Sequence, residues 1–216
     1  MNRGGGTGTV DCMAAPAIAV APATGKGERT RARLLEIAVR RFAAEGYRRT
    51  SVSDVARDAE LTPAAVYAYF SGKEALFEAA VDFDAAALID EARRALPATA
   101  LVRERLLVLI AELIDRLDAH PLARRVLAGG EPEVVRRLLD LPSLHALVVD
   151  TAELLEGAQE RGEVRTDVDP TLLSWGLETI VLTLLMGHLQ AGVDPGSNRA
   201  QGALTVLDAA LRPPSV

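Results

Sequence analysis

One short segment of the chain combines a hydroxyl, a helix start and small side chains. Thr62 can cap a helix whose first position is Pro63, where the missing N–H of proline costs nothing. The side chains of this segment that lie off its apolar period are mostly small: Thr62, Pro63, Ala64, Ala65, Ala68 and Tyr69. Hydroxyls and helix N-termini bind phosphate, and short side chains leave room for a groove. The segment therefore predicts a helix that can approach DNA closely.

The elements that would position this segment are also short helices. Four apolar residues at helical spacing precede it: Val52, Val55, Ala56 and Ala59. Ser51 can cap that helix together with Asp54, three residues further on. The connection, which lies within 58–61, is about three residues long, and this is typical of a helix-turn-helix whose second helix enters the major groove. Val66 and Phe70, four residues apart, should then face the core.

The charge of the chain is unevenly distributed. Lys and Arg number 24 against 30 Asp and Glu, and the net charge of −6 argues against a general affinity for nucleic acid. Residues 26–57 nevertheless carry nine basic and four acidic side chains, a net charge of +5, whereas residues 81–216 carry 13 Arg and 21 acidic residues, a net charge of −8. Within the basic region, Arg29 and Arg31 form either a solvated helix face or an arm that contacts phosphates, and we favour the arm.

Helical periodicity continues through the rest of the 216 residues, which suffice for one large domain or two smaller ones. From Glu28 onward apolar residues recur every three or four positions, and no long stretch alternates with period two, which predicts an all-α fold. Gly46 should end the first helix in a left-handed conformation, and Ser71 with Glu74 should form a capping box that starts a long helix. Further helices are predicted over 99–118, 121–128, 132–140, 143–161, 170–191 and 198–211.

The remaining segment, residues 1–26, is composed mainly of Gly, Ala, Thr and Pro without any helical or strand period. This composition predicts a disordered tail. Asp11 and Pro16 interrupt the only apolar stretch that would suit a secretory signal, and the single cysteine, Cys12, fits a reducing cytoplasm.

Residues 28–81 carry four motifs in a fixed order. These are F-x-x-x-G-Y at 42–47, T-S-V-x-D-V-A at 50–56, V-Y-x-Y-F at 66–70 and S-G-K-E-x-L-F at 71–77. In this compound pattern the chain resembles the N-terminal DNA-binding domain of the tetracycline-repressor (TetR) family. The resemblance implies a three-helix helix-turn-helix domain over 27–87, with the motif at about 50–69, and a helical ligand-binding and dimerisation domain over 88–212.

The resemblance also implies roles for individual residues. Phosphate contacts are expected from Thr50, Ser51, the Tyr69 hydroxyl and Lys73. Base edges would face Thr62, Pro63, Ala64 and Ala65, and Tyr67 would bridge the DNA backbone and the core. One position departs from the family, which often has Gly where this chain has Glu60, so we expect Glu60 either to avoid positive φ or to be strained.

The helix over 170–191 is apolar nearly all round, which suits a core helix, a subunit interface or a membrane span. Glu178 in its middle and the absence of a basic flank argue against the membrane. The resemblance favours a homodimer through the last two helices, which would present two recognition helices to a palindromic operator. The expected interface residues are Leu177, Ile180, Val181, Leu184, His188, Leu204, Leu207 and Leu211.

A ligand pocket is implied within the C-terminal helices. Its expected lining is Leu107, Ile110, Ile114, Leu144, Leu147, Val148, Trp175, Glu178 and Thr179. For each apolar member an ordinary core position is the main alternative, and Glu178 is suited either to a cationic ligand or to a structural pair. His120, His145 and His188 are too far apart in sequence to form a local metal motif, so we expect neither a metal nor a cofactor.

Together these patterns predict a cytoplasmic, ligand-responsive transcriptional regulator, most often a repressor in this family, that an unidentified small molecule releases from its operator. The alternative is a constitutive DNA-binding repressor or activator without an effector. An enzyme is disfavoured, because the sequence has no nucleophile elbow, no phosphate loop and no metal pair of histidines.

Overall fold

The computed structural model describes residues 25–98, 100–132 and 138–213, and these residues form helices and connections without any strand. The predicted all-α class is confirmed for this part of the chain. Gly25 and Lys26, assigned to the tail from sequence, already belong to the first helix. The rest of the predicted tail and most of the predicted 132–140 helix lie outside the described residues, and 138–140 form a single 3-10 turn.

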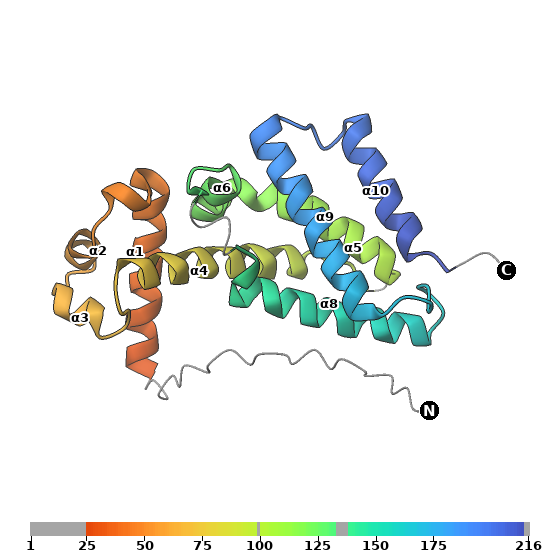
Figure 1. Ribbon diagram of the computed structural model, residues 1–216. Helices are drawn as coiled ribbons and strands as arrows, with labels where there is room; N and C mark the ends of the chain where they lie inside the picture. The colour runs from red at the N-terminus through yellow and green to blue at the C-terminus, as the bar shows by residue number, and fades with distance from the viewer. Residues whose placement is uncertain (1–24, 99, 133–137, 214–216) are drawn as a thin grey trace, which may run out of the picture.

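The helices fall into two groups (Figure 1). The first group contains α1 (Gly25–Arg49), α2 (Val52–Asp58) and α3 (Pro63–Tyr67). From it α4 (Lys73–Arg94) runs into a second group. The second group consists of α5 (Val102–Arg116), α6 (Pro121–Leu127), α8 (Pro142–Glu160), α9 (Pro170–Ala191) and α10 (Asn198–Leu211). The domain boundary predicted at residue 87 falls inside α4, which continues without a break.

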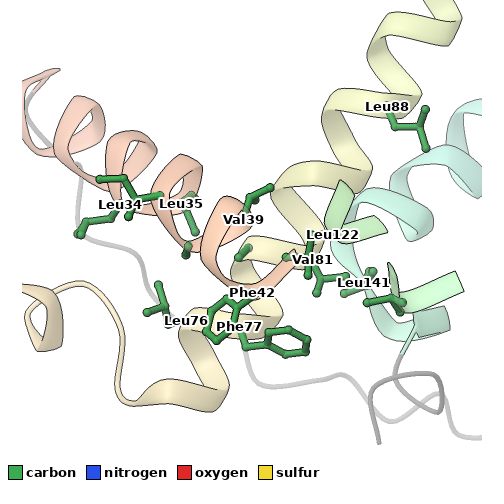
Figure 2. Close-up of a cluster of buried hydrophobic side chains, with 14 of the residues drawn as sticks. Leu34, Leu35, Val39, Phe42, Leu76, Phe77, Val81, Leu88, Leu122 and Leu141 are labelled. Atoms are coloured by element: carbon green, nitrogen blue, oxygen red, sulfur yellow. The ribbon is translucent and has the colours of Figure 1, made fainter. Parts of the chain in front are cut away.

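The core of the first group is built on the apolar stripe of α1. Figure 2 shows Phe42 of α1 against Phe77 of α4, and their rings meet edge to face with centroids 4.8 Å apart. Val66 and Phe70 are buried in the same cluster, which confirms that this side of the second short helix faces inward. The cluster continues along α4 to Leu122 and Leu141 of the second group, so the two groups share one apolar core.

Side-chain caps fix the ends of the short helices. Ser51 and Asp54 form the predicted capping box, and Thr62 Oγ1 accepts a hydrogen bond from the Ala65 N–H over 3.2 Å. The predicted capping box of Ser71 with Glu74 is wrong. Gly72 is the N-cap of α4, because the chain stays extended there (φ 174°) and enters the helix one residue later than predicted.

Two residues of the first group, Gly46 and Glu60, have positive φ, and for Glu60 this decides between the two alternatives that the sequence left open. Gly46 has φ 80° and ψ 167°, which kinks α1 rather than ending it, so a last turn continues to Arg49. Glu60 has φ 57°, and it is the one non-glycine residue with positive φ in the described part of the chain. The turn therefore has the left-handed conformation that glycine adopts more easily.

A buried polar cluster fastens α6 to α4. Asp84 of α4 accepts hydrogen bonds from the backbone N–H groups of Leu122 and Ala123, each over 2.9 Å. His120 Nδ1 lies 3.1 Å from the same carboxylate. Because a buried carboxylate at a helix N-terminus is held by both the N–H groups and the helix dipole, α6 is expected to move together with α4.

Candidate nucleic-acid interface and regulatory cavity

The turn between α2 and α3 is closed by backbone hydrogen bonds, with the Leu61 N–H donating to Ala56 O over 2.9 Å. Glu60 lies at the tip of this turn, and its carboxylate is 3.7 Å from the guanidinium of Arg33 on α1. Both side chains are well exposed, so this pair contributes little, at most about 1 kcal/mol. Arg33 nevertheless gives the Glu60 carboxylate a local partner of opposite charge.

The outer side of α3 is exposed to solvent. Thr62, Pro63 and Ala64 are exposed and Ala65 is partly buried, as a groove-facing helix start requires. Tyr67 is 53% exposed and Tyr69 is 37% exposed. Six of the residues predicted to contact DNA thus lie at exposed or partly exposed positions of this short segment, whereas Val66 between them is buried.

The structure contradicts the predicted phosphate contact of Thr50. Its side chain is only 1% exposed, and its hydroxyl donates to the carbonyl oxygen of Gly46 over 3.0 Å. A hydroxyl buried in this way cannot reach a phosphate, so Thr50 is a structural residue of the α1–α2 connection. The motif alone could not distinguish its role from that of its neighbour Ser51, which is exposed.

Ser51 is exposed, but its hydroxyl already has a partner. Ser51 Oγ donates to the Asp54 carboxylate over 2.6 Å, and the Ser51 N–H donates to the same oxygen over 3.1 Å. The Ser51 hydroxyl is the main cause of the lowered pKa of Asp54. A phosphate at the start of α2 would therefore compete with this carboxylate for the Ser51 hydroxyl.

Two cations are held beside α3 by aromatic rings. Lys73 Nζ lies 4.5 Å from the centre of the Tyr47 ring and donates to Arg48 O over 3.3 Å. The Arg31 guanidinium lies 5.3 Å from the centre of the Phe70 ring, and Arg29 is exposed two residues earlier on α1. Cation–π contacts restrict long side chains that would otherwise be mobile. The charges at Lys73 and Arg31 are thus oriented before any DNA arrives.

An ion pair between α1 and α2 is a feature that the sequence analysis missed. Arg41 binds both carboxylate oxygens of Asp58, with Nε–Oδ2 at 2.5 Å and Nη2–Oδ1 at 3.0 Å. The hydrogen bond from Arg41 is the main cause of the lowered pKa of Asp58. Arg41 also contacts Glu45 over 2.7 Å. Arg41 is therefore engaged in holding α2 in place, and the 17-residue separation gave no local signal for the pair.

A cavity of about 80 Å³ lies within the second helix group, between α4, α5, α6, α8 and α9. Its walls are apolar apart from Thr151, Ser174 and Glu178, and the Ser174 hydroxyl already donates to Val148 O over 2.7 Å. Burial raises the pKa of Glu178, an effect that His145 partly offsets. The cavity therefore offers apolar contact with few polar groups.

The cavity contains five of the nine residues predicted from sequence. Ile110, Leu144, Leu147, Val148 and Glu178 line it. The other four predicted residues do not line it, and they are Leu107, Ile114, Trp175 and Thr179. Leu107 and Ile114 instead pack on a second apolar cluster. Trp175 and Thr179 lie on the opposite face of α9, one turn apart, and are exposed.

The outer face of α9 and α10 also differs from the prediction. Leu177, Leu207 and Leu211 are buried inside the protomer, so they cannot form an interface surface, and Val181 lines the cavity. Ile180, Leu184 and Leu204 are partly buried against the second apolar cluster, and His188 Nδ1 lies 3.1 Å from Val193 O. The exposed apolar side chains are instead Leu172 (65%), Trp175 (60%) and Val206 (66%). Helical periodicity places these residues on the side away from the core.

Comparison with known proteins agrees with this geometry. The sequence model of the bacterial regulatory proteins of the tetR family matches residues 34–80, which run from α1 into α4. An uncharacterised HTH-type transcriptional regulator of Bacillus subtilis, YdgC, is 27% identical over 185 residues, covering 82% of this chain and 90% of that protein. Residues 34–80 therefore match a TetR-type DNA-binding domain, and the chain as a whole is similar to TetR-family transcriptional regulators.

Solved structures of TetR-family regulators share its fold. A Rhodococcus protein assigned to the family superposes with a TM-score of 0.65 at 22% identity, covering 85% of this chain and 99% of that one. FadR of Bacillus subtilis, solved in complex with stearoyl-CoA, gives a TM-score of 0.60 at 18% identity, covering 83% and 98%. These similarities support a DNA-binding regulator rather than an enzyme. Within the described residues no group of three or more His, Cys, Asp or Glu side chains is arranged to hold a metal.

Proposed function

We propose that this TetR-family protein is a ligand-responsive repressor that binds a palindromic operator as a homodimer and leaves it when a small molecule enters the cavity. The observation that carries the proposal is that the walls of the cavity include α4 and α6, the two helices that connect to the DNA-binding group. We propose residues 27–87 as the DNA-binding domain and 88–212 as the regulatory domain. Like other TetR-family proteins, it is expected to act in the cytoplasm.

The proposed DNA contact uses the exposed surface of α3 and the cations beside it. Thr62, Pro63, Ala64 and Ala65 would face base edges, while Tyr69, Lys73 and the N-terminus of α2 at Ser51 would contact phosphates. Arg29, Arg31 and Tyr67 would extend these contacts on either side. None of the proposed base-facing side chains can make the bidentate hydrogen bonds of Arg or Asn, so apolar contact with thymine methyl groups is expected to contribute to specificity.

The proposed coupling follows two routes from the cavity. Val81, Ala85 and Leu88 of α4 line it directly, and α4 begins at Lys73 beside the DNA-binding surface. Ala123 and Leu127 place α6 in the same wall. A ligand that displaces either helix would therefore change the position of α3 relative to its copy in the dimer.

The second route ends at the kink of α1. Arg125 of α6 donates to Glu131 Oε1 over 2.9 Å, and the same oxygen accepts the Tyr47 N–H over 3.0 Å. Tyr47 in turn forms the ring on which Lys73 lies. Movement of α6 would thus act on the backbone at the end of α1 and on one of the proposed phosphate contacts.

The exposed apolar face of α9 and α10 supports a dimer. In the described part of the chain α9 is the one helix long and apolar enough to cross a membrane, with a mean hydropathy of 1.5. Its inner side is already committed to the protomer through Leu177, Leu185 and the Ser174 hydroxyl. The outer side, with Leu172 and Trp175, is therefore proposed to be covered by the second copy rather than by lipid. A two-fold axis there would present two recognition helices about 34–36 Å apart, one turn of DNA.

The proposal is tested by selecting binding sites from a random DNA library and measuring affinity by fluorescence anisotropy. The expected result is a palindromic site bound by two chains, with affinity that falls steeply as salt rises. Cell metabolite fractions are then added to the complex, and at least one should release the DNA. Binding of a single chain to a non-palindromic site would contradict the dimer, and affinity unaffected by every fraction would leave a constitutive regulator.

A further inference from the structure

A groove of about 260 Å³ lies beside the cavity, between the end of α4, the start of α5 and α8. The two spaces share four wall residues: Leu106, Leu109, Leu147 and Thr151. Because these four residues line both spaces, a change in their side-chain rotamers would be the means of joining them. The joined space would be apolar at the cavity end and charged at the groove end.

The charged side chains of the groove are Arg93, Arg105 and Asp150. Arg93 Nη1 lies 2.7 Å from Asp150 Oδ2, so these two charges neutralise each other. Arg105 forms no ion pair with any described residue, and its Nε is enclosed and donates to no described group. Two guanidinium groups against one carboxylate leave the groove with a single positive charge.

Enclosing the Arg105 Nε–H without an acceptor or a counter-ion costs free energy, because nothing replaces the water that hydrated this group. The planar guanidinium suits a carboxylate or phosphate that accepts two parallel hydrogen bonds. Leu106, the next residue of α5, and Leu109, one turn after Arg105, begin the apolar wall of the groove. The arrangement therefore places an anion subsite next to a site for a hydrocarbon chain.

We propose that the effector is an amphipathic anion whose hydrocarbon chain occupies the cavity and whose carboxylate or phosphate head binds Arg105, with Arg93 as the second cation. This inference rests on the proposed ligand-responsive function and specifies the chemistry of its ligand. The rival is a lipophilic cation held by Glu178. Burial raises the pKa of Glu178, and it thereby disfavours the charged form that such a cation would need as its counter-ion.

The test compares four ligands with the same ten-carbon chain by isothermal titration calorimetry on the full-length protein: decanoate, decyl phosphate, decan-1-ol and decyltrimethylammonium. At least one of the two anions should bind about tenfold more tightly than decan-1-ol, as expected for a desolvated charge-assisted hydrogen bond. The two anions differ only in the head, so their ratio tells which head the groove prefers.

Three variants assign the effect to Arg105. Arg105→Met keeps the aliphatic stem, and it should bring the anion and the alcohol to nearly equal affinity. Arg105→Lys keeps the charge and should retain part of the preference. Arg94→Met is the matched control, since Arg94 is an exposed neighbour on α4 that does not line the groove, and it should leave the ratio unchanged. Circular dichroism verifies that each variant is folded.

The outcomes separate this inference from the proposed function. Equal binding of decanoate, decyl phosphate and decan-1-ol by the unmodified protein would overturn the role of Arg105 and leave the cavity as a ligand site. Tighter binding of decyltrimethylammonium, abolished by Glu178→Gln, would overturn it in favour of a lipophilic cation. Binding of none of the four would contradict both this inference and the cavity as an effector site, whereas DNA binding is measured independently.

Discussion

The DNA-binding group and the regulatory group use their polar side chains differently. In α1–α3 polar groups fix the backbone, as in the Ser51–Asp54 capping box and the Arg41–Asp58 pair, and a net charge of +5 over 26–57 faces the solvent. In the regulatory group the cavity walls are almost entirely apolar, and the excess of acidic residues lies elsewhere. The first group is thus held in shape by polar contacts, whereas the second encloses a space that is almost entirely apolar.

The largest effect is expected at the outer face of α9. Trp175→Glu puts a charge on the exposed apolar face of α9. Because a two-fold dimer carries the change in both copies, the free energy of dimerisation should weaken by about 4 kcal/mol or more. Sedimentation velocity should show monomers, and operator binding should be lost. Val149→Glu, at an exposed apolar position on α8, is the control and should leave the dimer intact. A dimer that survives Trp175→Glu would locate the interface on another surface.

The second prediction concerns the junction between the two groups. Gly46 has positive φ, and a Cβ built there would lie 2.5 Å from Arg125 Nη2 and 2.9 Å from Glu131 Oε1. Gly46→Val should therefore reduce the free energy of unfolding by about 2–3 kcal/mol, measured by urea denaturation. Gly72→Ala is the control, because its backbone is extended and nothing lies within 4 Å of the added Cβ. Similar losses for both variants would mean that the junction is not tightly constrained.

The DNA-binding group could be predicted from the sequence more completely than the regulatory group. The helix-turn-helix was predictable because caps, turn length and small side chains are local signals, and its buried residues Val66 and Phe70 follow from spacing. Thr50 was misassigned because the exposure of one hydroxyl depends on the kink at Gly46. In α9 the apolar pattern runs all round the helix, so it cannot indicate which face is buried, and Leu177 and Trp175 were assigned to the wrong sides. The sequence did not single out Arg105, because only the structure shows that its Nε is enclosed without a hydrogen-bond acceptor among the described residues.

The third prediction tests whether the charge beside α3 serves DNA rather than the fold. Lys73→Met removes the ammonium held on the Tyr47 ring, and operator affinity should fall about tenfold, with the salt dependence reduced by about one counterion. Anisotropy titrations at several salt concentrations measure both quantities. Lys26→Met removes a charge of the same kind at the exposed start of α1 and should have a smaller effect. An unchanged salt slope for Lys73→Met would contradict a phosphate contact there.

The smallest effect is expected from the pair that joins α1 to α2. The hydrogen bond from Arg41 lowers the pKa of Asp58 in the folded protein below its ordinary value of 3.8. A carboxyl with a depressed folded pKa stabilises the protein above its unfolded pKa, and this stabilisation is lost as the pH falls below about 4 through the folded pKa. Asp58→Asn should thus destabilise the protein slightly at pH 7 and approach the unmodified protein in stability at pH 3, measured by urea denaturation at both values. Asp118→Asn is the control, because Asp118 also pairs with an arginine but within the regulatory group, at a highly exposed site. If the difference between Asp58→Asn and the unmodified protein were the same at both pH values, the pair would contribute through packing alone, and the DNA-binding group would depend less on its charged contacts than its geometry indicates.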